Sequence, residues 1–188
     1  MTTGLHHDKV IRWAEADGDG RQKVVISRRR NGISMQGMVL TSTPAMIAAR
    51  FSLAVDDAWN VRSVRLEKLG CPDILRLEHD GFGRRTVNDA PAPELDGAHE
   101  PDISVTPLTN SFPVRRLALG RGESRDIVTA CIDVETMRIL ADGQRYTCLI
   151  PGERYRYESL DGDFTRDIEF DTEGYVDIYP ALFRRIHN

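Results

Sequence analysis

Turn residues recur along the chain about every 8–12 residues, and this spacing constrains the fold more than any other feature of the sequence. The turn pairs Asp-Gly, Pro-Gly and Glu-Gly occur at 80–81, 142–143, 151–152, 161–162 and 173–174. Between such pairs, apolar and polar residues alternate, as in 51–55, which is typical of a strand with one buried face. No strand–helix–strand alternation is visible, so a parallel sheet is not expected. The sequence therefore predicts an antiparallel sheet that closes into a roll or barrel.

Two local signals refine the N-terminal half. Asn31-Gly32 stands between two β-like runs and predicts a hairpin in which both turn positions have positive φ. The apolar residues change parity between Val61 and Val64, so we expect a bulge near Arg62-Ser63. The strands predicted in this half are 9–13, 23–27, 33–40, 51–55, 59–66, 75–77 and 82–87.

The C-terminal half repeats the pattern of short strands and turns. A stretch with three prolines and little periodicity, 88–101, precedes it and is interpreted as a loop. Asp142-Gly143 is interpreted as a turn that separates two strands. The strands predicted in this half are 127–134, 138–140, 146–150, 154–159, 167–171 and 175–179.

One stretch, about 106–118, favours a helix. Thr106 can cap it, and Pro107 suits the first helical position. Pro113 opposes a long helix because proline inside a helix bends or breaks it, so a short or kinked helix is predicted, with a strand or loop as the alternative. At 100° per residue, one apolar stripe comprises Leu108, Phe112 and Leu119.

Two adjacent arginines interrupt this apolar stretch. Arg115 falls within the stripe and Arg116 at its edge. A buried charge is costly unless it has an anionic or multiply hydrogen-bonding partner. We therefore expect Arg115 to be buried and paired with a carboxylate, and Arg116 to hold its head group at a pocket mouth or in solvent. The candidate carboxylates are Asp102, Asp171 and Asp177.

Composition excludes several classes of protein. The formal charge of −4 argues against nucleic acid as the main partner. No apolar run approaches a membrane span, and the polar residues 1–8, expected to be frayed, do not form a signal peptide, which predicts a cytoplasmic location. A length of 188 residues predicts a single domain over 1–188. Three cysteines without a CxxC pair predict free thiols, and no metal site, cofactor or catalytic motif is expected.

Tyrosines gather near the C-terminus, where Tyr155 and Tyr157 share one face of a predicted strand. An aromatic stripe of this kind is usually part of a core. Tyrosine also carries a hydroxyl that seeks a partner, so a pocket lined by tyrosines would suit an amphiphile. We expect these two residues, with Tyr146, to line a concavity beside the helix.

The sequence resembles a bacterial family known as the putative glycolipid-binding proteins. Its most specific block is TPLTNSFPVRRL (106–117), followed by DTEGYVDIYPALFRR (171–185). The chain departs from the family pattern at Ala98, where the family has Cys, and at Arg84-Arg85, where it has Trp. Further matching stretches are IRWAE (11–15), GISMQGMVL (32–40), DDAWNVRSVRLE (56–67), QRYTCL (144–149) and YRYES (155–159).

The resemblance implies a mainly β fold, a many-stranded antiparallel β-roll or half-barrel wrapped around one helix, similar to the bacterial carriers that ferry lipoproteins across the periplasm. It implies a protein that holds a lipid or glycolipid in the concavity of the roll without catalysis. Two alternatives stay open: an enzyme acting on a sugar or phosphorylated metabolite through carboxylates such as Asp56, Asp57 and Asp102, and a homodimeric interaction module. The candidate ligand-binding residues are Trp59, Asn110, Arg115, Arg116, Tyr146, Tyr155, Tyr157 and Tyr179.

Overall fold

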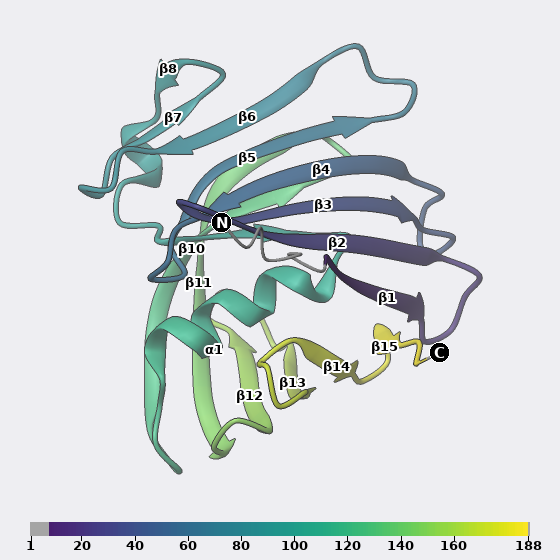
Figure 1. Cartoon of the computed structure of the whole chain (residues 1–188), viewed down its shortest axis with the longest axis vertical. Helices are drawn as coiled ribbons and strands as arrows, with labels where there is room; N and C mark the ends of the chain where they lie inside the picture. Colours follow the sequence, from purple (N-terminus) through teal and green to yellow (C-terminus); the bar gives the residue numbers. More distant parts are fainter. Residues whose placement is uncertain (1–7, 188) are drawn as a thin grey trace, which may run out of the picture.

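The computed structural model describes residues 8–187, and most of them lie in or beside one 15-stranded sheet (Figure 1). The strand order is β8-β7-β6-β5-β4-β3-β2-β1-β15-β14-β13-β12-β11-β10-β9. Strands β9 and β10 pair in parallel, whereas the other neighbours are antiparallel. The prediction of a many-stranded antiparallel roll around one helix is confirmed. The roll stays open instead of closing into a barrel, because β8 and β9 remain as edges.

The sheet has two halves that the last strand joins. The first half comprises β1 (Lys9–Glu15), β2 (Arg21–Arg29), β3 (Gly32–Leu40), β4 (Ala48–Val55), β5 (Val61–Lys68), β6 (Ile74–His79), β7 (Arg85–Val87) and β8 (Ala90–Pro91). The second half comprises β9 (Glu100–Ile103), β10 (Ser124–Asp133), β11 (Arg138–Ile150), β12 (Arg154–Ser159), β13 (Thr165–Phe170) and β14 (Val176–Tyr179). Strand β15 (Phe183–Arg185) pairs with both β1 and β14. Strand β15 was not predicted from the sequence, because its three residues are too few to show a period.

The two local signals in the first half have different outcomes. The bulge is confirmed, since Val55 pairs with Val61 and Ala54 with Ser63, which leaves Arg62 as the extra residue. The β2–β3 hairpin is present, but its turn lies one residue earlier than predicted. Arg29 pairs with Gly32, so the turn residues are 30–31, and of 30–32 only Gly32 has positive φ, at 120°. A side chain at Gly32 would also collide with the Val55 carbonyl, 2.2 Å from an added Cβ.

The predicted turn at Asp142-Gly143 is wrong. Strand β11 runs through it for 13 residues, and Gly143 pairs with Val128 of β10. The glycine marks a close approach instead of a turn, because a Cβ added there would lie 3.3 Å from the Cβ of Leu160. The predicted loop 88–101 contains β8, the short 3₁₀ helix η1 (Pro93–Leu95) and the start of β9.

The single predicted helix is confirmed. It begins as the 3₁₀ helix η2 (Pro107–Asn110) and continues as α1 (Ser111–Leu117). The Thr106 side chain accepts a hydrogen bond from the Leu108 amide, as expected for a cap. Pro113 is tolerated because it lies in the first turn of α1, where amide groups need no intrahelical acceptor. Ala118, with φ of 46°, ends the helix.

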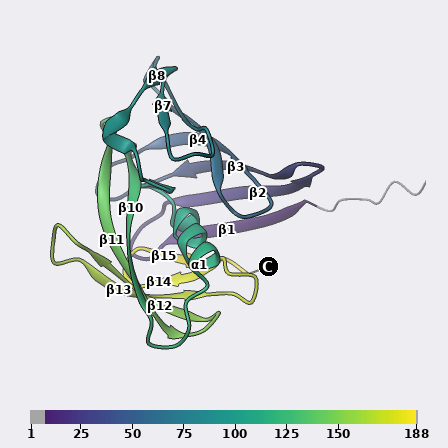
Figure 2. The same ribbon diagram turned by 90° about the vertical axis from the view of Figure 1, so that its left-hand side faces the viewer.

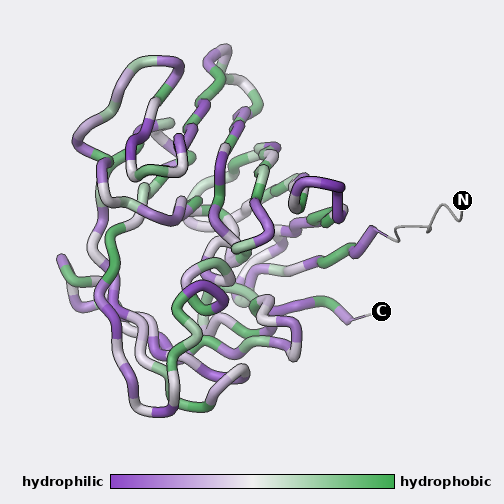
Figure 3. The backbone as a smooth tube through the Cα atoms, turned by 60° about the vertical axis from the view of Figure 1, so that its left-hand side comes forward, coloured by the Kyte–Doolittle hydropathy of each residue, from purple (hydrophilic) through white to green (hydrophobic). Residues whose placement is uncertain are grey.

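Two hydrophobic clusters form the core. The first packs the inner face of β1–β6 against β9, β10 and the start of the helix. The second, which contains most of the tyrosines, lies between the end of α1 and strands β10 to β14. Figure 2 shows α1 between the two halves of the sheet, and Figure 3 shows hydrophobic and hydrophilic residues alternating along the strands.

The structure of residues 8–187 bears on two expectations drawn from composition, the state of the cysteines and the lack of a membrane span. Cys71 and Cys131 are half-buried free thiols and Cys148 is a buried one, as predicted. Over this part of the chain, the structure contains no helix with the length and apolar character of a membrane span. The expectation that the N-terminus is frayed falls on residues 1–7, which lie outside the described part.

Candidate functional site

The tyrosines predicted to line a concavity lie beside the helix, and their rings fill the space there. Tyr146, Tyr155 and Tyr157 are buried in the second hydrophobic cluster, together with Tyr179. The ring centroids of Tyr146 and Tyr157 are 5.6 Å apart in an edge-to-face arrangement, and those of Tyr157 and Tyr179 are 6.4 Å apart. These rings pack as a core does. Their role in ligand binding stays a prediction.

The polar ends of this region find partners within the chain. The Tyr146 hydroxyl donates a hydrogen bond of 2.9 Å to Oδ1 of Asn110, and both side chains are buried. Burial raises the pKa of Tyr146 well above its ordinary value, and the nearby Asp102 raises it further. The Asp102 carboxylate accepts hydrogen bonds from Thr109 at 3.0 Å and from Gln144 at 2.8 Å. Asn110 therefore acts here as an internal hydrogen-bond partner.

Arg115 does not form the ion pair that was expected. Within residues 8–187 no carboxylate contacts it at salt-bridge distance, and the side chain is half-buried. Its guanidinium carbon instead lies 3.6 Å from the centroid of the Trp59 ring and 4.4 Å from that of Tyr175. Burial raises the pKa of Tyr175, and the Arg115 guanidinium opposes that rise. Trp59 adopts a φ of 66° in the β4–β5 loop, an uncommon conformation for a bulky residue.

Arg116 forms the internal ion pair instead. Its Nε donates to Oε1 of Glu100, a side chain that is only 3% exposed. The expectation that its head group lies at a pocket mouth stays a prediction. The helical phase measured from Leu108 does not carry over to α1, because the intervening η2 turns by about 120° per residue instead of 100°.

The carboxylates considered for an enzyme have separate structural partners. Asp56 accepts hydrogen bonds from the Ala58 and Asn60 amides within the β4–β5 loop, both at 2.9 Å. Asp57 lies 3.8 Å from Arg28 at the surface. Asp102 belongs to the buried network on β9 described above, and burial raises its pKa. Among residues 8–187, no group of His, Cys, Asp or Glu is arranged to hold a metal ion.

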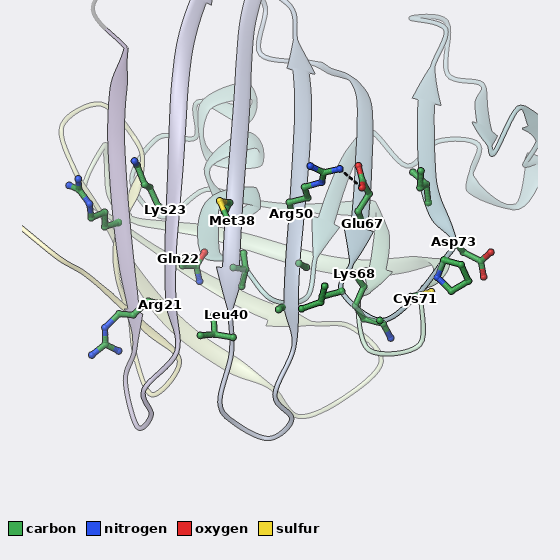
Figure 4. A pocket seen from close by; sticks show the side chains of 18 of the residues that line it. Arg21, Gln22, Lys23, Met38, Leu40, Arg50, Glu67, Lys68, Cys71 and Asp73 are labelled. Carbon is green, nitrogen blue, oxygen red and sulfur yellow. Dashed lines mark hydrogen bonds and ion pairs between the residues drawn. The ribbon is translucent and has the colours of Figure 1, made fainter.

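An open groove of about 880 Å³ lies on the opposite side of the sheet, facing away from α1 (Figure 4). One row of side chains crosses six strands at its centre, because the register places each residue opposite the next. The row is Arg12, Lys23, Met38, Arg50, Glu67 and Ile74. The row beside it contains Arg21, Leu40 and Ala48. A second hollow of about 510 Å³ continues the groove and shares Lys23, Met38, Arg50 and Glu67.

The groove combines an apolar floor with an excess of basic side chains. Five basic residues line it against two acidic ones, Glu67 and Asp73. Arg50 donates to Glu67 at 2.6 Å, whereas no carboxylate in the described part of the chain pairs with Arg12 or Lys23. The apolar lining includes Met38, Leu40, Leu69, Pro72, Ile74 and Ile186.

This groove was not predicted from the sequence. Its residues occupy the solvent-facing positions of alternating strands, which resemble ordinary surface positions in the sequence. The available signal was a pair of apolar residues at such positions, Met38 and Leu40, which are 70% and 49% exposed. Their grouping with basic residues depends on cross-strand register, which becomes visible only in the folded sheet.

Comparison with known proteins places the chain in a family. A family model described as "Putative glycolipid-binding" matches residues 10–185. The chain belongs to this family. It is also similar to a crystal structure of a DUF1089 family protein from Pseudomonas aeruginosa, with 26% sequence identity and a TM-score of 0.70. That match covers 99% of this chain and 98% of the other. The search of curated proteins found no match.

Three of the stretches that carried the resemblance to this family meet at Arg115. Trp59 comes from DDAWNVRSVRLE, Arg115 from TPLTNSFPVRRL and Tyr175 from DTEGYVDIYPALFRR. The two departures from the family pattern also meet, because the buried Arg85 donates two hydrogen bonds to the Ala98 carbonyl, at 2.9 and 2.6 Å. Burial lowers the pKa of Arg85 to about 10.

Proposed function

We propose that this protein binds an amphiphile, a lipid or glycolipid with an anionic head group, in the groove on the outer face of β1 to β6, without catalysing a reaction. The observation that carries the proposal is an apolar groove with five basic lining residues, two of which, Arg12 and Lys23, have no carboxylate partner among residues 8–187, in a chain whose formal charge is −4. The family description supports a binding role and points to the same class of ligand.

The size and floor of the groove suit a lipid chain. Small-molecule sites commonly measure about 300–1,000 Å³, and this groove has about 880 Å³. Met38, Leu40 and Ile74 would contact an alkyl chain laid across the strands. Each methylene group removed from water would contribute about 0.8 kcal/mol, so a short alkyl chain is enough for measurable affinity.

The basic side chains suit the head group. Arg12 and Lys23 lie opposite each other on neighbouring strands, and Arg21 lies one row away. Guanidinium groups bind phosphate or carboxylate through two parallel hydrogen bonds, and the same donors can bond to sugar hydroxyls. The Arg50–Glu67 pair adds both a donor and an acceptor within the groove.

Isothermal titration with two single-chain amphiphiles, each below its micelle concentration, tests the proposal. We expect dodecyl phosphate to bind with one saturable site and dodecyl maltoside to bind more weakly. The variant Arg12→Ser/Lys23→Ser should weaken dodecyl phosphate binding about tenfold, since two charge-assisted contacts are lost. The exposed Arg125 on β10 provides the control, because Arg125→Ser should leave the affinity unchanged.

Two results would overturn the proposal. Failure of the parent protein to bind either amphiphile would reject the function. Normal binding by Arg12→Ser/Lys23→Ser, with loss of binding when the interior tyrosines are changed, would move the site to the concavity beside α1.

Three expectations from the sequence remain part of the proposal: a single domain over 1–188, a cytoplasmic location and a homodimer. Light scattering on the purified protein tests the dimer. A monomer at micromolar concentration would contradict it.

A further inference from the structure

The outer face of β1 to β6 is basic well beyond the groove. A further row lies on the side of the central row away from Arg21. In it, the register places Arg65 opposite Arg76 and Ser52. Counted over both rows and Arg21, six basic side chains stand against one acidic side chain, although the whole chain has a net charge of −4. The basic residues are Arg12, Arg21, Lys23, Arg50, Arg65 and Arg76, and the acidic one is Glu67.

Two exposed apolar side chains lie in the loops at one end of the groove. Met46 belongs to the β3–β4 loop and is 82% exposed, and Leu69 belongs to the β5–β6 loop and is 81% exposed. The two loops are neighbours, because the Leu69 amide donates to the carbonyl of Ala48, where β4 begins, at 2.8 Å. A backbone hydrogen bond from Thr41 to Ile47 holds the β3–β4 loop closed, with Met46 at its surface.

We propose that this face docks on the surface of an anionic lipid bilayer. In this arrangement Met46 and Leu69 enter the head-group layer, and the basic rows face lipid phosphates. The groove would then take up its amphiphile directly from the membrane, so this inference rests on the proposed function. It adds the source of the ligand and the orientation in which the protein meets it.

The composition of the face favours lipid over other anionic partners. Sheets that bind single-stranded nucleic acid place aromatic side chains on the binding face, whereas the apolar residues of these rows are aliphatic. A second copy of the chain would present the same excess of positive charge and be repelled. The β1–β2 turn carries the exposed Asp17 and Asp19, so we expect the contact to form on the β3 to β6 side of this end.

Vesicle co-sedimentation tests the inference. We expect binding to vesicles of phosphatidylcholine with about 30% phosphatidylglycerol, and little binding to phosphatidylcholine alone. Added salt at about 0.5 M should reduce binding, because it screens charges at the membrane surface. Met46→Glu and Arg76→Glu should each weaken binding about fivefold, since each brings a negative charge to the lipid surface.

Matched variants elsewhere on the surface serve as controls. Phe82, in the β6–β7 turn at the opposite end of β6, is 93% exposed, so Phe82→Glu introduces the same charge at an equally exposed apolar position. Arg125→Glu repeats the charge reversal on β10. Neither control should change vesicle binding. Equal loss of binding in the controls, or no binding of the parent protein to anionic vesicles, would overturn the inference.

The two proposals fail in different ways. Met46 does not line the groove, so Met46→Glu should retain the parent affinity for monomeric dodecyl phosphate while losing vesicle binding. Vesicle binding without any binding of monomeric amphiphile would reject the proposed function and support docking alone. A dimer that Met46→Glu dissociates, without vesicle binding by the parent, would assign the face to a second copy and overturn the inference.

Discussion

The interior beside α1 and the groove on the outer face of β1 to β6 both combine apolar surfaces with polar groups, but the two regions differ in how many of those groups have partners within the chain. In the interior, Tyr146 donates to Asn110 and Arg116 to Glu100. In the groove, Arg12 and Lys23 meet no carboxylate from the described part of the chain. Buried polar groups must form hydrogen bonds within the protein, whereas exposed ones can bond to water until a ligand binds. The difference separates residues that hold the fold from residues available for binding.

The tyrosine cluster offers the largest effect by which to test this comparison. Tyr155→Ala/Tyr157→Ala should destabilise the protein by about 5 kcal/mol or more, because truncating one buried aromatic side chain commonly costs about 3–5 kcal/mol. Urea denaturation measures the loss. Tyr155→Phe keeps the ring and should remain close to the parent in stability. A stable double variant that has lost only amphiphile binding would mark the cluster as the ligand site instead.

The next largest effect concerns Arg116. Arg116→Met should cost about 3–5 kcal/mol, because it leaves the carboxylate of Glu100 buried without its partner. Thermal and urea melts measure the loss. The double variant Arg116→Met/Glu100→Met should recover most of it, since replacing both members of a buried pair by apolar groups is often neutral. A single variant that melts like the parent would show that the pair is solvated.

Arg115, its neighbour on α1, should have a smaller effect. Arg115→Met removes the cation contacts with Trp59 and Tyr175 and should cost about 1 kcal/mol, the usual value for such contacts near a surface. The same melts compare it with Arg116→Met. Arg115→Lys keeps the charge, and its stability should lie between that of the parent and that of Arg115→Met. A cost equal to that of Arg116→Met would reveal a buried partner for Arg115.

The sequence predicted much of the architecture because local chemistry determines it. The parity change located the bulge at Arg62, and Thr106-Pro107 located the start of the helix. Both signals depend on residues only a few positions apart in the sequence. Where a local signal had two meanings, the prediction failed. Gly143 could mark either a turn or a close approach to another part of the chain. It approaches Leu160, which is 17 positions away in the sequence, so no local signal shows the contact.

The candidate site was harder to predict because it depends on contacts between distant segments. The roles of Arg115 and Arg116 follow from the 3₁₀ start of the helix, which shifts the phase of α1. The groove arises only when six strands align Arg12, Lys23 and Met38 in one row. Alternation within a strand distinguishes two faces, but it does not show that the solvent-facing one is hollowed.

Met38 should give the smallest effect on stability and complete the comparison. It is 70% exposed at the centre of the groove, so Met38→Ser should change the free energy of unfolding by no more than about 0.5 kcal/mol. Its side chain would cover part of a bound alkyl chain, and its loss should weaken dodecyl phosphate binding about threefold to tenfold. Met46→Ser is the matched control, because Met46 is exposed but does not line the groove. Titration and urea denaturation on both variants separate binding from stability. If Met38→Ser loses stability but binds normally, the outer face contributes to the fold as the interior does, and the contrast between the two regions is wrong.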